Sequence, residues 1–289
     1  MSRAKEILRK VRKIEISTKR LVDGLITGSY HSVFRGNGIE FSEIREYHYG
    51  DDVRAIDWKV TARLNKPFIK EFIEERDLRV YFAIDFSAST NFGRVIEKRQ
   101  KAVEAVASIG LSAVKNNDNI GLFIFTDKIE SYVPARKGKR HALKILSIIL
   151  SHNPESKKTD IKRSLASIAK IIKKRSVIFV LSDFFDSSSF IKPLEQLKKR
   201  HDVIAMRLLD ARELMLPDVG LIQLEDEETG EQVLIDTSDP EFIDNYAKEV
   251  SERIRAVSTM FKRNRISLID INTDQAIDVP LRKFFSRRR

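Results

Sequence analysis

Apolar runs and helical periodicities alternate along most of this chain, from Leu78 to its last strand. Continuous apolar runs predict strands at 78–85, 120–125, 129–134, 177–181, 203–209 and 266–271. Apolar positions at three-to-four spacing predict helices from about 94, at 142–149, at 161–172, near 190–199 and from about 240 to 264. This alternation is typical of an α/β domain with a doubly wound, mostly parallel sheet of the Rossmann type.

The first part of the chain follows other patterns. Apolar residues recur at helical spacing from Ala4 to Leu25, which predicts an amphipathic helix with a strongly basic outer face. Two interpretations stay open: the helix docks on its own domain with a solvated basic face, or that face contacts a membrane surface or a partner. The turn-rich segment that follows does not decide between helix and strand. We divide the chain into a basic helix at 1–27, an appended segment at 28–76 and the main domain at 77–289.

Charge and short apolar runs add detail near the end of the chain. Apolar runs at 221–224 and 232–235 flank an acidic turn, which predicts an inserted β-hairpin near 219–236. The net charge is +11 at pH 7, and much of the excess lies at the two ends, including a basic C-terminal tail. Because no aromatic-and-basic signature for base stacking accompanies this charge, we do not expect nucleic acid as the partner. Peripheral membrane contact through the basic termini stays open.

Composition limits the class of protein and of site. A hydrophobic content of 42% supports a sizeable core. We see neither a signal peptide nor an apolar run of the roughly 20 residues that cross a bilayer. The absence of cysteine excludes disulfides and thiolate sites and fits a reducing compartment. We therefore expect a cytoplasmic protein, membrane-peripheral at most, in which oxygen or imidazole holds any metal.

Polar side chains gather where the predicted strands of the main domain end. Asp85 ends the first strand, Ser87 and Ser89 follow it, Thr159 precedes a helix, and Asp183 follows another buried strand. In a doubly wound sheet, ligands bind outside the carboxyl ends of the strands, where the winding direction reverses. Carboxylate and hydroxyl oxygens are hard donors suited to Mg²⁺. The sequence therefore predicts a divalent-metal site at this edge.

The order Asp85-x-Ser87-x-Ser89, then Thr159, then Asp183 resembles the metal-ion-dependent adhesion site of von Willebrand factor A-type domains. The resemblance implies a von Willebrand factor A-like fold that binds Mg²⁺, or Mn²⁺ or Ca²⁺, through these five residues. It also implies that an acidic residue of a partner protein completes the coordination shell.

A purely structural interpretation of the same residues stays open. Ser87, Ser89 and Thr90 would cap the following helix, and Thr159 with Asp160 would cap another. Asp183 would then merely end a strand.

A second resemblance lies in the appended segment. Its motifs are Gly36–Phe41, Arg45–Tyr47, Gly50–Asp52, Arg54, Ile56–Lys59 and Ala62–Arg63. Together they resemble the signature of the domain of unknown function 58 family, whose members are often encoded beside MoxR-type AAA+ ATPases. The resemblance implies an adaptor or co-chaperone that acts with such an ATPase in the assembly or maturation of protein complexes.

The charged residues of this segment allow two roles. Gly50-Asp51-Asp52 with Arg54, Asp57 and Lys59 would form an ion-pair network that fixes the segment to the sheet, with Trp58 as an apolar anchor. Alternatively, Arg45, Arg54 and Lys59 form a surface for a partner.

Enzymatic signatures do not emerge from the sequence. Ser87 stands where a haloacid dehalogenase-type phosphatase requires a second carboxylate, and none of the five histidines has a triad-like context. No glycine-rich loop has the Walker spacing. We expect a non-enzymatic protein. The leading alternative is a metal-dependent nuclease or nucleic-acid-binding protein that uses Asp57, Asp85 and Asp183 together with the basic charge.

Overall fold

The computed structural model divides the chain into two compact units, one made of residues 1–33 and 79–289 and the other of residues 34–78. The structure describes residues 3–21, 30, 39–74, 78–87, 95–185, 189–210, 213, 216, 218–225 and 232–288. Ser89 and Thr90 lie outside the described residues, as does most of the acidic turn of the predicted hairpin. Each unit is described separately below.

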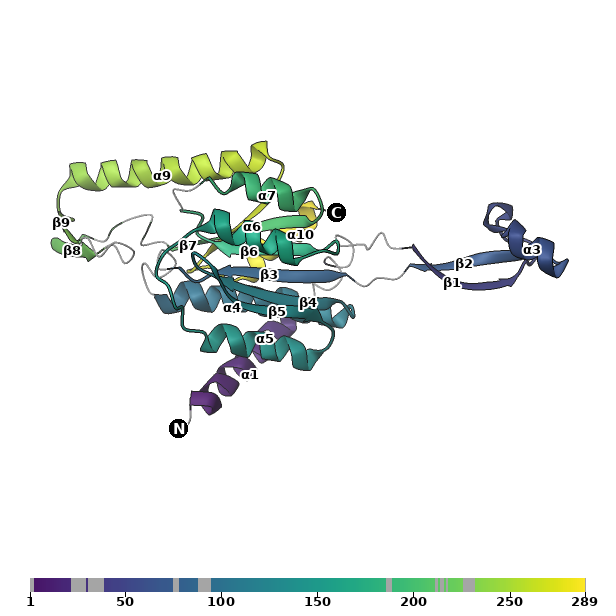
Figure 1. The fold of residues 1–289 in the computed structure, drawn as a ribbon. Helices are drawn as coiled ribbons and strands as arrows, with labels where there is room; N and C mark the ends of the chain where they lie inside the picture. The colour runs from purple at the N-terminus through teal and green to yellow at the C-terminus, as the bar shows by residue number, and fades with distance from the viewer. Residues whose placement is uncertain are drawn as a thin grey trace. The chain divides into compact units, whose positions relative to one another are not determined.

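Within the described residues, the larger unit is built on a six-stranded sheet (Figure 1). In spatial order its strands are β10 Ser267–Asn272, β7 Asp202–Leu209, β6 Val177–Ser182, β3 Arg79–Asp85, β4 Asn119–Phe125 and β5 Ile129–Arg136. Neighbouring strands are parallel except β4 and β5. The chain runs outward from β3 to β5 and then crosses to β6, so its winding reverses between β3 and β6. The expected mixed α/β architecture with a mostly parallel sheet is confirmed.

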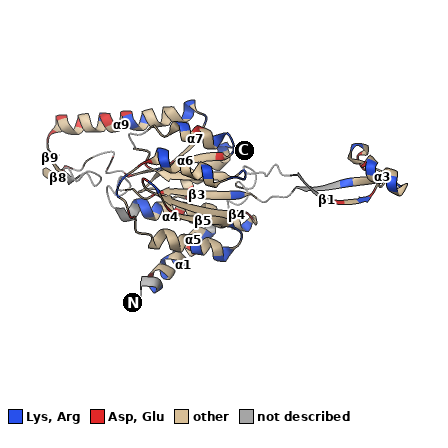
Figure 2. Ribbon diagram, viewed as in Figure 1, with Lys and Arg blue, Asp and Glu red and all other residues tan. Residues whose placement is uncertain are grey.

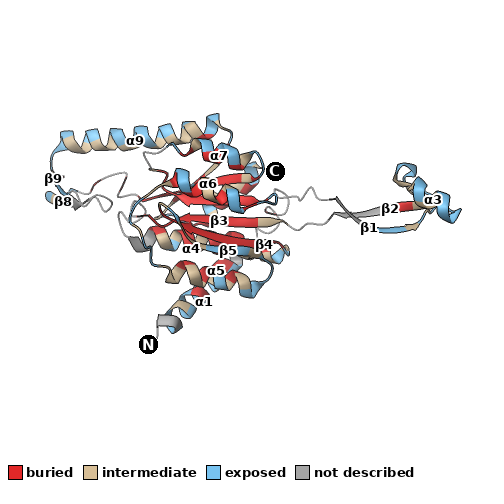
Figure 3. Cartoon of the chain, viewed as in Figure 1, coloured by how far each residue is buried: buried red, intermediate tan, exposed pale blue. Residues whose placement is uncertain are grey.

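Helices cover both faces of this sheet (Figure 1). On one face lie α6 Ile161–Ile171, α7 Ile191–Lys198 and α9 Pro240–Arg263. On the other lie α1 Arg3–Leu21, α4 Val95–Lys115 and α5 Lys139–Ser151. Because both faces are covered, the central strands are buried on both sides (Figure 3).

Successive residues of β3 show how the core is divided between the two faces. Tyr81 and Ala83 belong to the hydrophobic cluster that includes buried residues of α6 and α7. Phe82 points the other way, stacks on Phe179 with ring centroids 5.7 Å apart and lies beside Gly110 of α4. Side chains of a strand alternate between faces, so a strand buried on both sides has an apolar residue at nearly every position. This explains the continuous apolar runs in the sequence.

The C-terminal residues, predicted as a basic tail, form α10 Asp278–Arg287 instead. Leu281 and Phe285 lie four residues apart, on one face of this helix, and both are buried. Arg288 donates to Oδ2 of Asp202 over 2.6 Å and fixes the end of the helix to the start of β7. The basic end of the chain is therefore helical, and an apolar pair at helical spacing attaches it to the domain.

A hairpin and a long helix precede the last strand. The strands β8 Leu221–Glu225 and β9 Gln232–Asp236 pair antiparallel. The helix α9 begins after Asp239, whose side chain accepts a hydrogen bond from the backbone N–H of Glu241 over 3.0 Å. In the part of the chain that the structure describes, no helix combines the length and apolar character needed to cross a membrane.

The smaller unit contains the antiparallel strands β1 Ile39–Glu46 and β2 Phe68–Glu74, with η2 Val53–Ala55 and α3 Trp58–Leu64 between them. The carboxylate of Asp57 caps α3 by accepting hydrogen bonds from the backbone N–H groups of Lys59 and Val60, over 3.0 and 3.4 Å. The helix ends at Asn65, which adopts a left-handed conformation with φ of 54°.

Candidate functional site

The carboxyl ends of β3 and β6 meet at the point where the winding of the sheet reverses. Ile84 lies opposite Leu181 in the parallel pairing of these strands, so the residues that follow, Asp85 and Ser182, are neighbours. The Ser182 hydroxyl donates to Oδ2 of Asp85 over 2.8 Å. Asp183, the next residue, is also buried. Residues almost a hundred positions apart in the chain therefore form one polar cluster at the switch point.

Asp85 is a carboxylate in an unfavourable environment. It is buried, and its Oδ1 accepts a hydrogen bond from the backbone N–H of Ser87 over 2.9 Å. Burial, and then the negative charge of Asp183, raise the pKa of Asp85 to about 7, although hydrogen bonds from Ser87 and Ser182 act in the opposite direction. Ser87 itself is fully buried. The first two residues of the predicted motif therefore lie together in the interior.

Asp183 has one oxygen that is not satisfied. Its Oδ1 accepts a hydrogen bond from the backbone N–H of Phe185 over 3.1 Å. Its Oδ2 is buried and has no hydrogen-bond partner among the described residues. A buried, unsatisfied carboxylate oxygen is costly and calls for a compensating charge.

The nearest described cation to this oxygen is Lys98 of α4, whose Nζ lies 4.0 Å from Oδ2 of Asp183. Lys98 is buried and forms an ion pair with Glu213, which is buried as well. Burial raises the pKa of Glu213, and the charge of Lys98 partly opposes that effect. Two acidic residues and the lysine therefore share one desolvated region.

Sequence reasoning missed Lys98 and Glu213. One signal was available for Lys98, because it lies on the buried side of α4, four residues before the buried Ala102. A lysine at such a position is rarely buried without a carboxylate partner. No comparable signal marks Glu213, since the segment around it carries no clear periodicity.

Thr159 lies in the loop between α5 and α6 and is half-buried. It directly precedes Asp160, whose side chain caps α6 by accepting a hydrogen bond from the backbone N–H of Arg163 over 2.7 Å. Capping is thus the role of Asp160, as the structural interpretation expected. The structure gives Asp85 and Asp183 a shared environment and places Thr159 on a different loop.

This loop is held at the same edge of the sheet by a set of polar and aromatic contacts. The Glu130 carboxylate accepts hydrogen bonds from the backbone N–H groups of Glu155 and Ser156, over 3.1 and 3.2 Å. Its Oε2 also lies 2.7 Å from Nε2 of His152. The His152 ring contacts the ring of Phe86, the residue after Asp85, with centroids 5.4 Å apart. The start of the Thr159 loop is therefore tied to the residue that follows Asp85.

The smaller unit arranges its charged residues differently from the predicted network. Arg45 donates two hydrogen bonds to Asp51, over 2.8 and 2.9 Å, and mainly for this reason the pKa of Asp51 falls to about 2. Asp57 pairs with Lys70 over 3.0 Å. Trp58 is 67% exposed, so the prediction that it anchors the segment is wrong.

The three residues predicted to face a partner therefore differ in whether their side chains are already held by an ion pair. Arg45 is held by Asp51, whereas the Arg54 and Lys59 side chains are exposed. Asp57 serves as a helix cap and ion-pair partner inside residues 34–78, while Asp85 and Asp183 belong to the other unit.

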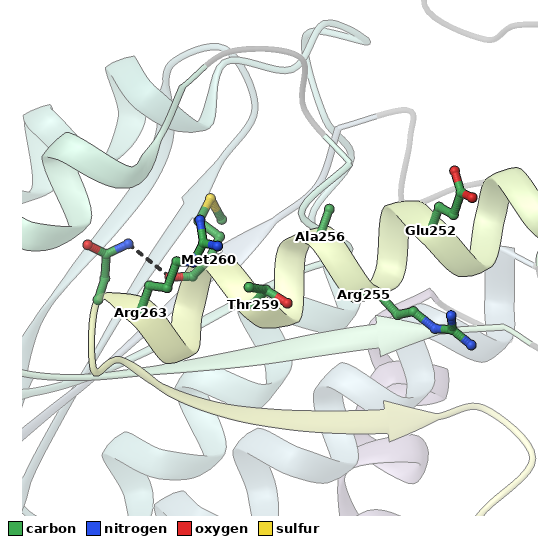
Figure 4. A pocket seen from close by; sticks show the side chains of 7 residues that line it. Glu252, Arg255, Ala256, Thr259, Met260 and Arg263 are labelled. Carbon is green, nitrogen blue, oxygen red and sulfur yellow. Dashed lines mark hydrogen bonds between the residues drawn. The ribbon is translucent and has the colours of Figure 1, made fainter.

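An open groove of about 550 Å³ lies along α9 (Figure 4). It is lined by Glu252, Arg255, Ala256, Thr259, Met260, Arg263 and Asn264. All of these residues belong to one helix and its C-cap, where Asn264 Nδ2 donates to the backbone oxygen of Met260 over 2.8 Å. Ligand pockets normally enclose their ligand between converging walls. We assign no function to this groove.

Solved structures with a similar arrangement share little sequence with this chain. The conserved hypothetical protein BatB from Bacteroides thetaiotaomicron matches with a TM-score of 0.43 and 12% identity, over 73% of this chain and 98% of that structure. A von Willebrand factor type A structure from Catenulispora acidiphila matches with a TM-score of 0.40 and 9% identity, over 76% of this chain and 43% of that structure.

Sequence relatives are more similar. The uncharacterized protein Rv1480 of Mycobacterium tuberculosis is 31% identical over 283 residues, which cover 96% of this chain and 89% of that protein. The uncharacterized protein YeaD of Bacillus subtilis is 30% identical over 100 residues, which cover 35% of this chain and 23% of YeaD. A family model described as "Protein of unknown function DUF58" matches residues 43–256, a range that contains Asp85 and Asp183 as well as most of the smaller unit. Since this match spans well over half of the chain, the protein belongs to the DUF58 family.

Proposed function

We propose that this chain is a non-enzymatic, metal-dependent protein-binding module. Asp85, Ser87, Ser89, Thr159 and Asp183 would hold Mg²⁺, or Mn²⁺ or Ca²⁺, and an acidic residue of a partner would complete the shell. The observation that carries the proposal is the pair of buried carboxylates, Asp85 and Asp183, at the switch point of the sheet. Buried like charges destabilise one another, and a divalent cation between them would offset that cost.

The available donors fit such an ion. Among the described residues, no three His, Asp or Glu side chains cluster so as to form a metal site by themselves. The site therefore depends on hydroxyl oxygens and water in addition to its two carboxylates, which suits Mg²⁺ because this ion keeps several waters. When bound, the ion would supply a position that accepts a carboxylate oxygen of the partner. The unsatisfied Oδ2 of Asp183 is the atom that most needs such a cation.

Lys98 reduces the net negative charge of the buried carboxylates around the proposed site. Its pairing with Glu213 leaves one of the three buried carboxylates already compensated. Asp85 and Asp183 then balance a divalent ion with no large excess of charge of either sign. A partner carboxylate would consequently meet a site whose own charges are nearly balanced once the metal is bound.

Calorimetry tests the metal site directly. Protein freed of metal with EDTA should bind Mg²⁺ with one-site stoichiometry. The Asp85→Asn variant should show no heat of Mg²⁺ binding. Asp270→Asn is a matched control, because Asp270 lies on β10 and pairs with Arg207, far along the sheet from β3. Wild-type protein that shows no Mg²⁺ binding, or an Asp85→Asn variant that binds as well as the control, would remove the metal from the proposal.

Membership of the DUF58 family supports a more specific partner, a MoxR-type AAA+ ATPase, for which this chain would act as an adaptor or co-chaperone. The test is direct binding between this chain and a MoxR-type AAA+ ATPase from the same organism. Because an ATPase itself requires Mg²⁺, EDTA cannot serve as the control, and Asp85→Asn replaces it. We expect the wild-type chain and Asp270→Asn to bind and Asp85→Asn to lose binding.

A nuclease assay tests the non-enzymatic assignment. The purified chain should leave DNA and RNA intact in Mg²⁺ or Mn²⁺. Robust cleavage that disappears in Asp85→Ala would identify a metal-dependent nuclease instead.

A further inference from the structure

The helix α1 has two faces of opposite character. Its inner face packs against α4 and α5 and buries Val11 and Thr18. Its outer face consists of exposed residues on the opposite side, Lys5, Leu8, Arg9, Arg12, Lys13, Ile16 and Lys19. At about 100° per residue these seven positions fall within an arc of roughly 140°. The sequence pattern alone left open whether this basic face is merely solvated.

The outer face combines cations with two large aliphatic side chains. Leu8 is 63% exposed and Ile16 is 65% exposed, although the opposite side of the helix is buried. The two described acidic residues of α1 are engaged at the margins of this face, Glu6 with Lys10 over 2.9 Å and Glu15 with Lys139 over 2.5 Å. Within residues 5–19, the outer face therefore carries positive charge only. Figure 2 marks the Lys and Arg residues along α1 in blue.

We propose that the outer face of α1 binds the surface of an anionic lipid bilayer. Its five cations would contact lipid phosphates, and Leu8 and Ile16 would enter the boundary between headgroups and acyl chains. Helices that lie in a membrane interface have this composition, with Lys and Arg around a few apolar residues. Exposed aliphatic side chains favour lipid over nucleic acid, which binds through cations and aromatic stacking.

The helix is ready to bind without a folding step. Its inner face is fixed to the domain by packing, and the Glu15–Lys139 ion pair joins it to the first turn of α5. The outer residues are therefore presented together, and binding incurs little of the ordering cost that a disordered basic segment would incur. The proposed metal site takes no part in this contact, so the two proposals can fail independently.

Vesicle sedimentation tests the proposal with the full chain. The protein should bind vesicles of phosphatidylcholine mixed with phosphatidylglycerol, and should not bind phosphatidylcholine alone. Binding should weaken as salt is added, because surface charge is screened. Neutralising Arg9, Arg12 and Lys13 to Gln should reduce the partition coefficient by about fivefold for each cation removed. The matched control neutralises three exposed cations elsewhere, Lys173, Lys174 and Arg175, and should bind like the wild type.

The aliphatic contribution requires its own variants. Leu8→Gln with Ile16→Gln keeps good helix formers and all charges, and should lower binding about tenfold or more. Leu8→Trp in a Trp58→Phe background gives a single reporter, whose emission should shift to the blue on anionic vesicles only. Circular dichroism and melting temperature confirm that each variant is folded.

Three results would overturn the proposal: vesicle binding equal in both triple variants, no vesicle binding by the wild type, or unchanged binding by the Leu8 and Ile16 double variant with no blue shift. Retention on polyglutamate or RNA without vesicle binding would assign the face to another partner and equally overturn it.

Discussion

Lys98 Nζ lies 4.0 Å from Oδ2 of Asp183, and both side chains are 1% exposed. The same ammonium group pairs with Glu213, so α4 supplies one buried cation to two carboxylates from distant parts of the chain. Removing one member of a buried ion pair leaves the other charges without compensation, which destabilises a protein strongly. We therefore expect this lysine to influence both the stability of the site and its affinity for a cation.

Lys98→Met should destabilise the metal-free protein by about 3 to 5 kcal/mol, the usual effect of breaking a buried pair. It should also strengthen Mg²⁺ binding, on the order of tenfold, because the ammonium no longer repels a second cation. Urea unfolding in EDTA and calorimetry with Mg²⁺ measure the two effects. Lys10→Met, in which an exposed pair with Glu6 is lost, should change stability by less than about 1 kcal/mol and leave Mg²⁺ binding unchanged.

A double variant keeps the Lys98 prediction testable even if the single variant is poorly folded. Lys98→Met with Glu213→Leu removes both charges and should recover much of the lost stability, since apolar pairs often replace buried ion pairs without loss. Tighter Mg²⁺ binding should persist in the double variant. Unchanged or weaker Mg²⁺ binding would contradict the role given to Lys98.

Asp85→Asn should stabilise the metal-free protein at pH 8. Burial and the neighbouring Asp183 raise the pKa of Asp85 to about 7, so its ionised form is disfavoured in the folded state. An amide removes that charge while keeping an acceptor for the Ser87 N–H. We expect a gain of roughly 2 kcal/mol in unfolding free energy in EDTA, together with loss of the stabilisation that Mg²⁺ gives the wild type. A variant that is less stable than the wild type in EDTA would show that Asp85 is satisfied by the protein alone.

Variants of Thr159 and Asp160 distinguish a metal-binding role of their loop from a structural one. Asp160→Ala removes the cap of α6 and should cost about 1 kcal/mol of stability without changing Mg²⁺ affinity. Thr159→Ala should lower Mg²⁺ affinity at least several-fold with little effect on stability in EDTA. Thermal melting and calorimetry on the two variants provide the comparison, and equal Mg²⁺ affinity in both would exclude Thr159 from the site.

Acid should weaken the smaller unit through Asp51. Its folded pKa of about 2 lies below the ordinary value of 3.8, so its contribution is fully present above pH 4 and is lost as the pH falls toward 2. Arg45→Gln should lower stability above pH 4, and its difference from the wild type should vanish near pH 2. Trp58, the single tryptophan of the chain, lies in this unit and reports its unfolding by fluorescence. Arg54→Gln should leave the pH profile unchanged, because Arg54 does not contact Asp51 through its side chain in the structure.

Two glycines of the larger unit should respond to alanine in opposite directions. A Cβ on Gly121 would lie 2.4 Å from the Tyr81 ring and 2.9 Å from the backbone oxygen of Val133, so Gly121→Ala should destabilise by about 1 to 3 kcal/mol. A Cβ on Gly110 would lie 3.6 Å from Phe82, an ordinary contact inside α4. Gly110→Ala should therefore stabilise by about 0.5 to 1 kcal/mol through helix propensity. Chemical denaturation of both variants checks the signs.

Short-range patterns in the sequence determined most elements of the larger unit. Hydrophobic periodicity depends on which side of a strand or helix meets the core. Residues on the same side recur every two to four positions, so a short stretch of sequence is enough to reveal the pattern. The strand that ends at Asp85 and the helix that begins at Ile161 were therefore predicted within a few residues of their observed bounds. Strand ends also placed Asp85 and Asp183 at a common edge, because parallel strands align their carboxyl ends.

Only the tertiary structure decided the relationships that depend on distance in space. Lys98 and Glu213 are 115 positions apart, and no local pattern predicts that the charges of two such distant residues come together. The exposure of Trp58 was equally hidden, since the burial of an aromatic residue depends on whether a neighbouring layer exists to receive it. The sequence by itself thus determined where the carboxylates of the candidate site lie along the strands. Burial and long-range packing, which are properties of the folded chain, decided that Lys98 pairs with Glu213 and lies beside Asp183.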